Sequence, residues 1–294
     1  MGRVAVLGAG RMGLPIVRAL VRDGHVVSVF DVRPEVAESV RAAGAIPADD
    51  VSHALAGTEV LLSVLPGAPE LREATDGILT AARPGSTWIE LTSAAPEMGA
   101  ELSEAARERG VDFLEAPMGG GPTAAEAARL TLFGGGDAAL LDQHRQLLHS
   151  FAERIHFCGP PGAGYLSKLL INQLWFGQAV AVAEALLLGQ AGGVSAQTLS
   201  GLLNQSPAAS AFVTDYVPAL LAGDYLPSFG LERVVEELES LQRLAEAREV
   251  PLPVAKAVAR VHREALEHYG PIDGELLGAA YLQHLAGRRL DELS

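Results

Sequence analysis

The first half of the chain alternates short apolar runs with amphipathic stretches. Four of the runs are rich in β-branched residues and predict buried strands: Val4 to Leu7, Val26 to Phe30, Val60 to Val64, and Thr87 to Leu91. Three more candidates cover residues 111–114, 130–133 and 154–157. Strands that alternate with helical patterns are typical of βαβ units, so we expect residues 1–161 to form a doubly wound α/β domain around a parallel sheet.

The pattern changes after residues 159–162, which are Gly-Pro-Pro-Gly. Beyond them, apolar residues recur three and four positions apart and no strand pattern is evident. We predict an all-helical domain over residues 162–294, entered by a helix from about Gly164 to Gln190. This helix would be roughly 40 Å long and could join the two domains. Three amides interrupt the fifteen uncharged residues between Lys168 and Glu184, which favours a buried helix over a membrane span.

Composition narrows the classes of function. Acidic residues outnumber basic ones by 36 to 22, and the formal charge of -14 disfavours nucleic acid as a partner. Cys158 is the single cysteine, so an internal disulfide cannot form, and the eight histidines show no metal-ligand spacing. The N-terminus lacks the basic, apolar and small-residue order of a secretory signal. We therefore expect a cytoplasmic protein without a structural metal or a membrane anchor.

A glycine motif follows the first predicted strand and opens a helical pattern. The motif GxGxxG is matched by Gly8, Ala9, Gly10, Arg11, Met12 and Gly13. Gly8 would permit a tight turn, Gly10 would let the backbone approach a pyrophosphate, and Gly13 would allow close packing of helix on strand. The helix N-terminus attracts negative charge. In this context the motif indicates a Rossmann dinucleotide-binding unit, the alternative being a glycine-rich turn without a ligand.

An acidic residue ends the second predicted strand. Asp31 lies eighteen residues beyond Gly13, where a carboxylate can accept hydrogen bonds from the adenosine ribose. Its charge would repel the 2′-phosphate of NADP, which favours NAD as the cofactor. Arg33, two residues further on, could approach such a phosphate, so NADP is not excluded.

The predicted long helix carries candidates for acid–base chemistry. Moving a hydride to or from a carbonyl carbon requires a group that exchanges a proton with the oxygen. Lys168 and Asn172 are four residues apart and share one face of the helix. Burial among apolar neighbours would lower the pKa of Lys168 toward working pH. From spacing alone, a lysine whose amine reaches solvent is an equal alternative.

The chain resembles the β-hydroxyacid dehydrogenase family, whose members include 3-hydroxyisobutyrate dehydrogenase and tartronate semialdehyde reductase, over essentially its full length. Four segments carry the resemblance: residues 6–13, residues 115–121, residues 130–133 with 135–137, and the set Gly162, Gly164, Lys168 and Asn172. Of these, residues 115–121 match the family's substrate loop, which is usually Asp-Ala-Pro-Val-Ser-Gly-Gly.

The resemblance implies a role for each motif. Lys168 would be the general acid/base, and Asn172 would orient it or the substrate. Backbone N–H groups of Gly119, Gly120 and Gly121 would receive a substrate carboxylate, because successive amides form an anion-binding nest. Leu65 and Pro66, after one strand, and Thr92 and Ser93, after the next, would line the cofactor cleft.

Two positions depart from the family pattern. Gly119 stands where the family has a serine, and Glu236-Glu237 stands where it typically has Lys-Asp. A cation near the nicotinamide would thus be replaced by the anion of Glu236. Glu236 lies nearly opposite the apolar stripe of its predicted helix, so it faces either solvent or the cleft. In the cleft it would favour a neutral or amine-bearing substrate.

Together with the resemblance, the sequence therefore predicts an oxidoreductase that transfers a hydride between NAD(P) and the hydroxyl or carbonyl group of a small β-hydroxyacid-like substrate. The alternatives are an imine reductase, which would tolerate an anion near its substrate, and a noncatalytic NAD(P)-binding protein with a diverged site. Long apolar helical faces often pack against a second copy, so we also expect a homodimer or homotetramer formed through the helical domain.

Overall fold

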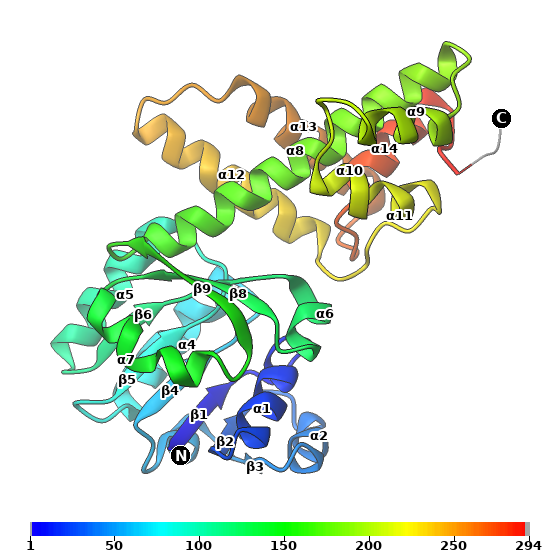
Figure 1. Ribbon diagram of the computed structural model, residues 1–294. Helices are drawn as coiled ribbons and strands as arrows, with labels where there is room; N and C mark the ends of the chain where they lie inside the picture. Colours follow the sequence, from blue (N-terminus) through cyan, green and yellow to red (C-terminus); the bar gives the residue numbers. More distant parts are fainter. Residues whose placement is uncertain (1, 292–294) are drawn as a thin grey trace. The chain divides into compact units, whose positions relative to one another are not determined.

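A computed structural model describes residues 2–291 of the chain. The chain divides into two compact units, of which the first ends at Lys168 and the second begins at Leu169 (Figure 1). The first unit combines strands and helices, and the second is built from helices. The predicted class, an α/β dinucleotide-binding fold followed by an all-helical region, is confirmed.

The first unit is organised around one sheet. Its strands are β1 (Arg3–Leu7), β2 (Val26–Phe30), β3 (Ile46–Pro47), β4 (Val60–Ser63), β5 (Thr87–Glu90), β6 (Asp112–Glu115), β7 (Met118–Gly119), β8 (Leu130–Gly135) and β9 (Ala152–Gly159). They are ordered β3-β2-β1-β4-β5-β6-β8-β7, and β9 pairs with β8. All seven predicted strands are present.

The sheet departs from the prediction at one side. The strands from β3 to β6 are parallel, but β8 runs antiparallel to both β6 and β7. The predicted parallel sheet is therefore confirmed from β3 to β6, and the antiparallel β8 is a correction to it. The connection between β7 and β8 contains only the six-residue helix α6 and a few loop residues. A parallel crossover needs a longer connection.

Helices cover both faces of the sheet. They are α1 (Gly13–Arg22), α2 (Val36–Ala42), α3 (Val51–Leu55), α4 (Ala68–Ala81), α5 (Pro96–Glu108), α6 (Gly121–Glu126) and α7 (Ala138–Leu148). Successive residues of a strand point to opposite faces. Val4 and Val6 of β1 accordingly join one buried apolar cluster, and Ala5 and Leu7 join another. Burial on both faces explains why the central strands are continuous apolar runs.

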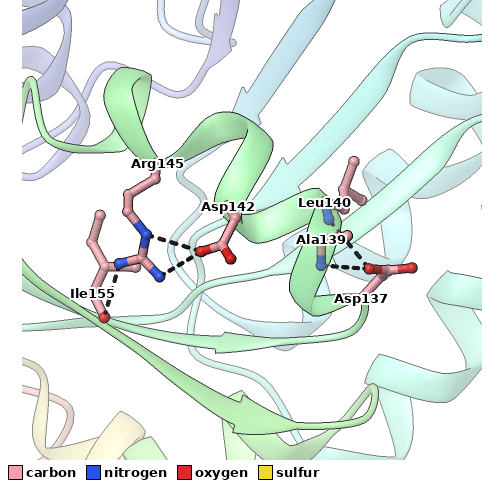
Figure 2. Close-up of polar contacts among 6 residues, drawn as sticks. All are labelled: Asp137, Ala139, Leu140, Asp142, Arg145 and Ile155. Atoms are coloured by element: carbon pink, nitrogen blue, oxygen red, sulfur yellow. Dashed lines mark hydrogen bonds and ion pairs between the residues drawn. The ribbon is translucent and has the colours of Figure 1, made fainter.

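Helix α7 shows how side chains fix an element in this unit (Figure 2). Asp137 caps its N-terminus, because one carboxylate oxygen accepts the N–H groups of Ala139 at 2.7 Å and Leu140 at 3.2 Å. About two turns after the cap, Arg145 donates to Asp142 at 2.8 Å and to the carbonyl of Ile155 in β9 at 3.4 Å. The helix is thus tied to the neighbouring strand.

The long helix α8 (Ala163–Ala191) extends the predicted range by one residue at each end. The others are α9 (Ala196–Asn204), α10 (Ala211–Asp215), α11 (Val217–Leu221), α12 (Leu231–Ala247), α13 (Pro253–Tyr269) and α14 (Leu277–Ala286). In the second unit α12 packs against α13, and α13 packs against α14.

Helix α8 is long and apolar enough to cross a membrane, judged by length and composition alone. Its most apolar window has a mean hydropathy of 1.3, and one third of that window is buried. Its residues nevertheless contribute to the core of the second unit. Ala183 and Leu186 pack in one cluster with Phe212 and Val217, and Phe176 packs in another with Val234. The predicted role as a core helix is supported by this packing, although several of its leucines remain exposed.

Candidate active site

The glycine loop after β1 has the close contacts that its sequence predicts. Gly8 has a φ of +94°, and a Cβ atom there would lie 2.2 Å from the carbonyl oxygen of Val64. A Cβ atom on Gly13 would lie 2.1 Å from the carbonyl oxygen of Gly8. A Cβ atom on Gly10 would clash with nothing, since its nearest neighbour would be the Arg33 guanidinium at a van der Waals distance of 3.6 Å. The loop therefore fits a pyrophosphate that approaches the backbone at Gly10.

This loop lies where the strand order reverses. Strand β1 lies between β2 and β4, so the connections on its two sides diverge. Ligands of doubly wound sheets bind at this point, beyond the carboxyl ends of the strands. A cleft of about 250 Å³ beside the loop is lined by Ala9, Gly10, Arg11, Arg33, Val36 and Ser39, among others.

Asp31 follows β2 at the same edge of the sheet. Its Oδ2 accepts the N–H of Ala9 at 2.8 Å, and its Oδ1 pairs with the Arg33 guanidinium at 2.9 Å. Burial raises the pKa of Asp31, but the hydrogen bonds from Arg33 and Ala9 outweigh this effect and hold it below the usual value. Asp31 is therefore an anion at neutral pH, and Arg33 is directed at it.

The residues expected to line the cofactor cleft after β4 and β5 are joined to each other. Thr92 is buried, and its Oγ1 accepts the N–H of Leu65 at 3.0 Å. Pro66 is exposed, and Ser93 is half-buried. The ends of these two strands are thereby held together at the edge of the sheet that carries the glycine loop.

The predicted substrate loop spans β7 and the start of α6. Gly120 and Gly121 have φ values of +110° and +64°, a conformation that favours glycine. A Cβ atom on Gly119 would come within 3.2 Å of the Phe133 ring. The ring of Phe133 thus approaches the space into which the family's serine side chain would project.

A buried carboxylate that the sequence reasoning did not single out holds the start of α8. Glu115, the last residue of β6, accepts the N–H groups of Gly162 and Gly164 at 2.8 Å. Burial raises the pKa of Glu115, although these bonds oppose the rise. A Cβ atom on Gly99 or Gly135 would come within 2.3 Å of the carboxyl oxygens. Glycines therefore make the room for this cap.

A second buried carboxyl group, also missed from sequence, lies nearby. Glu90 ends β5, is fully buried, and accepts the O–H of Tyr165 at 2.5 Å. Burial raises the pKa of Glu90 to about 7, against hydrogen bonds from Thr92 and Tyr165. The signal available in the sequence was a carboxylate inside an apolar run, because Glu90 lies within the strand predicted from Thr87 to Leu91.

Lys168 lies on α8 one turn after Tyr165 and is half-buried. Asn172 lies one turn further on, as the spacing predicts, and its Nδ2 donates to Oε2 of Glu237 at 2.7 Å. Glu237 is buried on α12. The bond orients the Asn172 amide, and the sequence reasoning had not anticipated it.

The position of Glu236 was left open by the sequence. The five residues of the predicted apolar stripe on α12 are all buried: Leu231, Val234, Val235, Leu238 and Leu241. Glu236 is exposed, as the stripe predicts, and its Oε2 pairs with the Arg233 guanidinium at 2.9 Å. The charge of Glu236 is thus partly balanced on its own helix, which weakens the argument that it rewrites a substrate pocket.

Among residues 2–291, no three or more His, Cys, Asp or Glu side chains are grouped so that they could hold a metal ion.

Two family models together match most of the chain. The model described as the NAD-binding domain of 6-phosphogluconate dehydrogenase matches residues 3–159. The model described as NAD-binding of NADP-dependent 3-hydroxyisobutyrate dehydrogenase matches residues 162–276. The chain belongs to the 3-hydroxyisobutyrate dehydrogenase family. It is a dehydrogenase of the class that acts on a CH–OH group with NAD or NADP, as the resemblance implied.

Individual members of the 3-hydroxyisobutyrate dehydrogenase family are similar over nearly the whole chain. The NAD-dependent L-serine dehydrogenase of Pseudomonas aeruginosa is 31% identical over 91% of this chain and 93% of its own length. The solved structure of 3-hydroxyisobutyrate dehydrogenase from Mycobacterium tuberculosis with L-serine is 28% identical, with a TM-score of 0.88, covering 97% of this chain and 99% of that one.

Imine reductases share the architecture of this family. The V8 variant of the imine reductase from Myxococcus stipitatus, in complex with NAD+, is 24% identical, with a TM-score of 0.66, over 96% of this chain and 99% of that one. At this identity the similarity shows the fold alone. Because Glu236 is paired with Arg233, its charge no longer favours the imine reductase alternative over a dehydrogenase.

Proposed function

We propose that the protein oxidises the hydroxyl group of a small β-hydroxyacid with NAD, and that Lys168 exchanges the hydroxyl proton. The observation that carries the proposal is the anchoring of α8: Glu115 and Glu90 fix its first turn, one turn before Lys168. A general acid/base must be held within hydrogen-bond reach of the reacting oxygen, so a rigidly anchored lysine suits this task.

Each remaining part of the site has a role in this proposal. The bound nicotinamide cofactor supplies the hydride acceptor. The glycine loop and Asp31 bind and orient the dinucleotide, with the pyrophosphate at Gly10 and the ribose at Asp31. Asn172, oriented by Glu237, assists Lys168 or binds substrate on the same side of α8.

We propose that the substrate carboxylate binds to the backbone N–H groups of residues 119–121. Gly119 offers no hydroxyl group there, and the Phe133 ring lies close to the space a side chain would need. Recognition would therefore depend on main-chain donors and on the shape set by Phe133. Main-chain donors in a nest bind anions without a charged side chain.

NAD is proposed as the preferred cofactor. The Asp31 carboxylate is charged and lies at the edge where the adenosine ribose binds, and Arg33 is engaged with it. An NADP 2′-phosphate would meet the Asp31 anion, and Arg33 would have to leave its ion pair to compensate. Both effects act against NADP.

The substrate class can be tested with four compounds that share one scaffold. L-serine and 3-hydroxyisobutyrate are both β-hydroxyacids and differ in an amino or a methyl group on the α-carbon. Both compounds are chosen because similar proteins are named as dehydrogenases of them. We expect NADH production from at least one of them, and none from either corresponding amide, which lacks the carboxylate. Turnover of the amides at equal rates would contradict carboxylate recognition. Turnover of none of the four would contradict the proposed function.

We also propose a homodimer or homotetramer formed through the helical unit. Large apolar side chains are exposed on two of its helices: Leu174 and Leu188 on α8 are 65% and 75% exposed, and Leu285 on α14 is 60% exposed. Leu188 and Leu285 line one groove with Leu187 and Leu282. Apolar surface of this kind is typical of an interface. A cytoplasmic location, expected from the single cysteine, is part of the same proposal.

A further inference from the structure

Glu90 occupies an unusual place for a carboxyl group. It is the last residue of β5, which lies between β4 and β6 in the middle of the sheet, and it is fully buried. A buried carboxyl group is costly unless its oxygens are hydrogen-bonded. The partners of the two oxygens therefore indicate why the group is there.

One oxygen of Glu90 faces the cofactor edge. Its Oε1 accepts the N–H of Thr92 at 2.7 Å, and Thr92 in turn accepts the N–H of Leu65 through its hydroxyl group at 3.0 Å. Ser63, at the end of β4, donates a longer bond of 3.4 Å to the same oxygen. The segments that follow β4 and β5 are thus bound to one carboxyl group.

The other oxygen faces α8. Oε2 accepts the O–H of Tyr165 at 2.5 Å, and Tyr165 is also fully buried. Burial raises the pKa of Tyr165 well above its usual value, with a further rise from the neighbouring Glu90, so its hydroxyl remains a donor. Tyr165 lies in the first turn of α8, three residues before Lys168.

We propose that Glu90 and Tyr165 are positioning residues, which hold the cofactor-side ends of β4 and β5 in fixed register with the turn of α8 that carries Lys168. The inference rests on the proposed function only in assigning the proton transfer to Lys168. Hydride and proton transfer to one substrate require the cofactor and the acid/base group to be aligned, and a misplacement of about 1 Å can cost roughly a hundredfold in rate. A single carboxyl group bonded to both sides supplies such alignment.

The test uses three variants of the full-length protein. Tyr165→Phe removes the bond to α8 and leaves the Thr92 side intact. Glu90→Met is nearly isosteric and removes both sides. The double variant no longer buries the Tyr165 hydroxyl without its acceptor, so it should recover stability relative to Glu90→Met. Thr58→Val is the matched control, since it removes a buried hydroxyl group that bonds locally to the carbonyl of Leu55.

We expect Tyr165→Phe to lower kcat about tenfold or more while the Kd for NADH stays within about twofold. Glu90→Met should lower kcat and also raise the Kd for NADH. Relative to Glu90→Met, the double variant should regain melting temperature but not kcat, and Thr58→Val should lose stability without a change in kcat or Kd. Recovery of kcat together with stability in the double variant would reduce the pair to a structural role and overturn the proposal.

A second readout does not depend on turnover. Amide hydrogen exchange should quicken in residues 163–168 of Glu90→Met and at Val64 and Leu65 of Tyr165→Phe, because each substitution cuts a link to the other element. Changes confined to the element that carries the substitution would contradict the link. If the unsubstituted protein oxidises no β-hydroxyacid, the proposed function fails, whereas the exchange data still decide whether the link exists.

Discussion

At the scale of single residues, the ion pair between Asp31 and Arg33 governs the choice of cofactor. Asp31→Asn removes the anion that would oppose a 2′-phosphate and releases Arg33 to approach it. We expect the ratio of kcat/KM for NADP to that for NAD to rise about tenfold, equivalent to about 1.4 kcal/mol. Steady-state kinetics with both cofactors measure this ratio. Arg33→Ala is the control and should not raise the ratio. An unchanged ratio in Asp31→Asn would show that Asp31 does not discriminate.

Glu90 makes stability depend on pH in a direction that can be stated in advance. The pKa of Glu90 is about 7 in the folded chain, above its usual value of 4.5. Between these two pH values the folded state therefore keeps a proton that the unfolded state has lost. The stability it contributes is complete below pH about 4.5 and is lost as pH rises toward 7. Relative to Glu90→Gln, the free energy of unfolding of the natural chain should therefore fall between pH 4.5 and 7.

Denaturant unfolding of both proteins across this range measures the difference. Glu115, Tyr165, Thr92 and Ser63 surround Glu90, and all four remain in the variant. Glu104→Gln is the control for the direction of the pH dependence. Glu104 is exposed and its pKa is lowered by Arg107, so any contribution should vanish as pH falls below its usual value. A difference between natural chain and Glu90→Gln that is constant or grows with pH would contradict the burial of a neutral acid.

At the scale of elements, the cap of α7 offers a matched pair of substitutions. Asp137→Ala leaves the N–H groups of Ala139 and Leu140 without their acceptor and should cost about 1 kcal/mol of unfolding free energy. Asp142→Ala removes an exposed ion pair with Arg145 on the same helix and should cost about 0.5 kcal/mol or less. Denaturant unfolding of both variants tests this order, which a larger effect of Asp142→Ala would reverse.

Many of the helices and strands were predictable from the sequence. The apolar runs located seven strands, and the period of the second half predicted α8 to within one residue at each end. Strands β3 and β7 have only two residues each and show no pattern. The antiparallel course of β8 depends on pairing with β6 and β7, which lie upstream in the sequence and which local periodicity does not identify.

The candidate site was likewise predictable from the sequence only in part. The glycine loop and the order of Lys168 and Asn172 are local patterns, so they could be read directly. The bonds of Glu90 to Tyr165 and of Asn172 to Glu237 join residues 75 and 65 positions apart. Such partners follow only from tertiary packing, because each residue alone looks like an ordinary polar position at the end of a strand or on a helix.

At the scale of the whole molecule, the exposed apolar side chains of the helical unit predict self-association. Leu188→Glu places a charge in the groove that Leu285 also lines, and should shift the assembly toward the monomer because a buried unpaired charge is costly. Light scattering after size exclusion measures the mass. Val32→Glu is the control, since Val32 is 85% exposed in the other unit and should leave the mass unchanged. An unchanged mass in Leu188→Glu would place any interface elsewhere.

The central claim is that a dehydrogenase of this family performs its proton transfer through Lys168. With the best substrate of the β-hydroxyacid panel, Lys168→Ala should lower kcat by about a thousandfold, within the range for loss of a general acid/base. The Kd for NADH should stay within about twofold, because the glycine loop and Asp31 are untouched. Turnover in Lys168→Ala close to that of the natural chain would contradict the account.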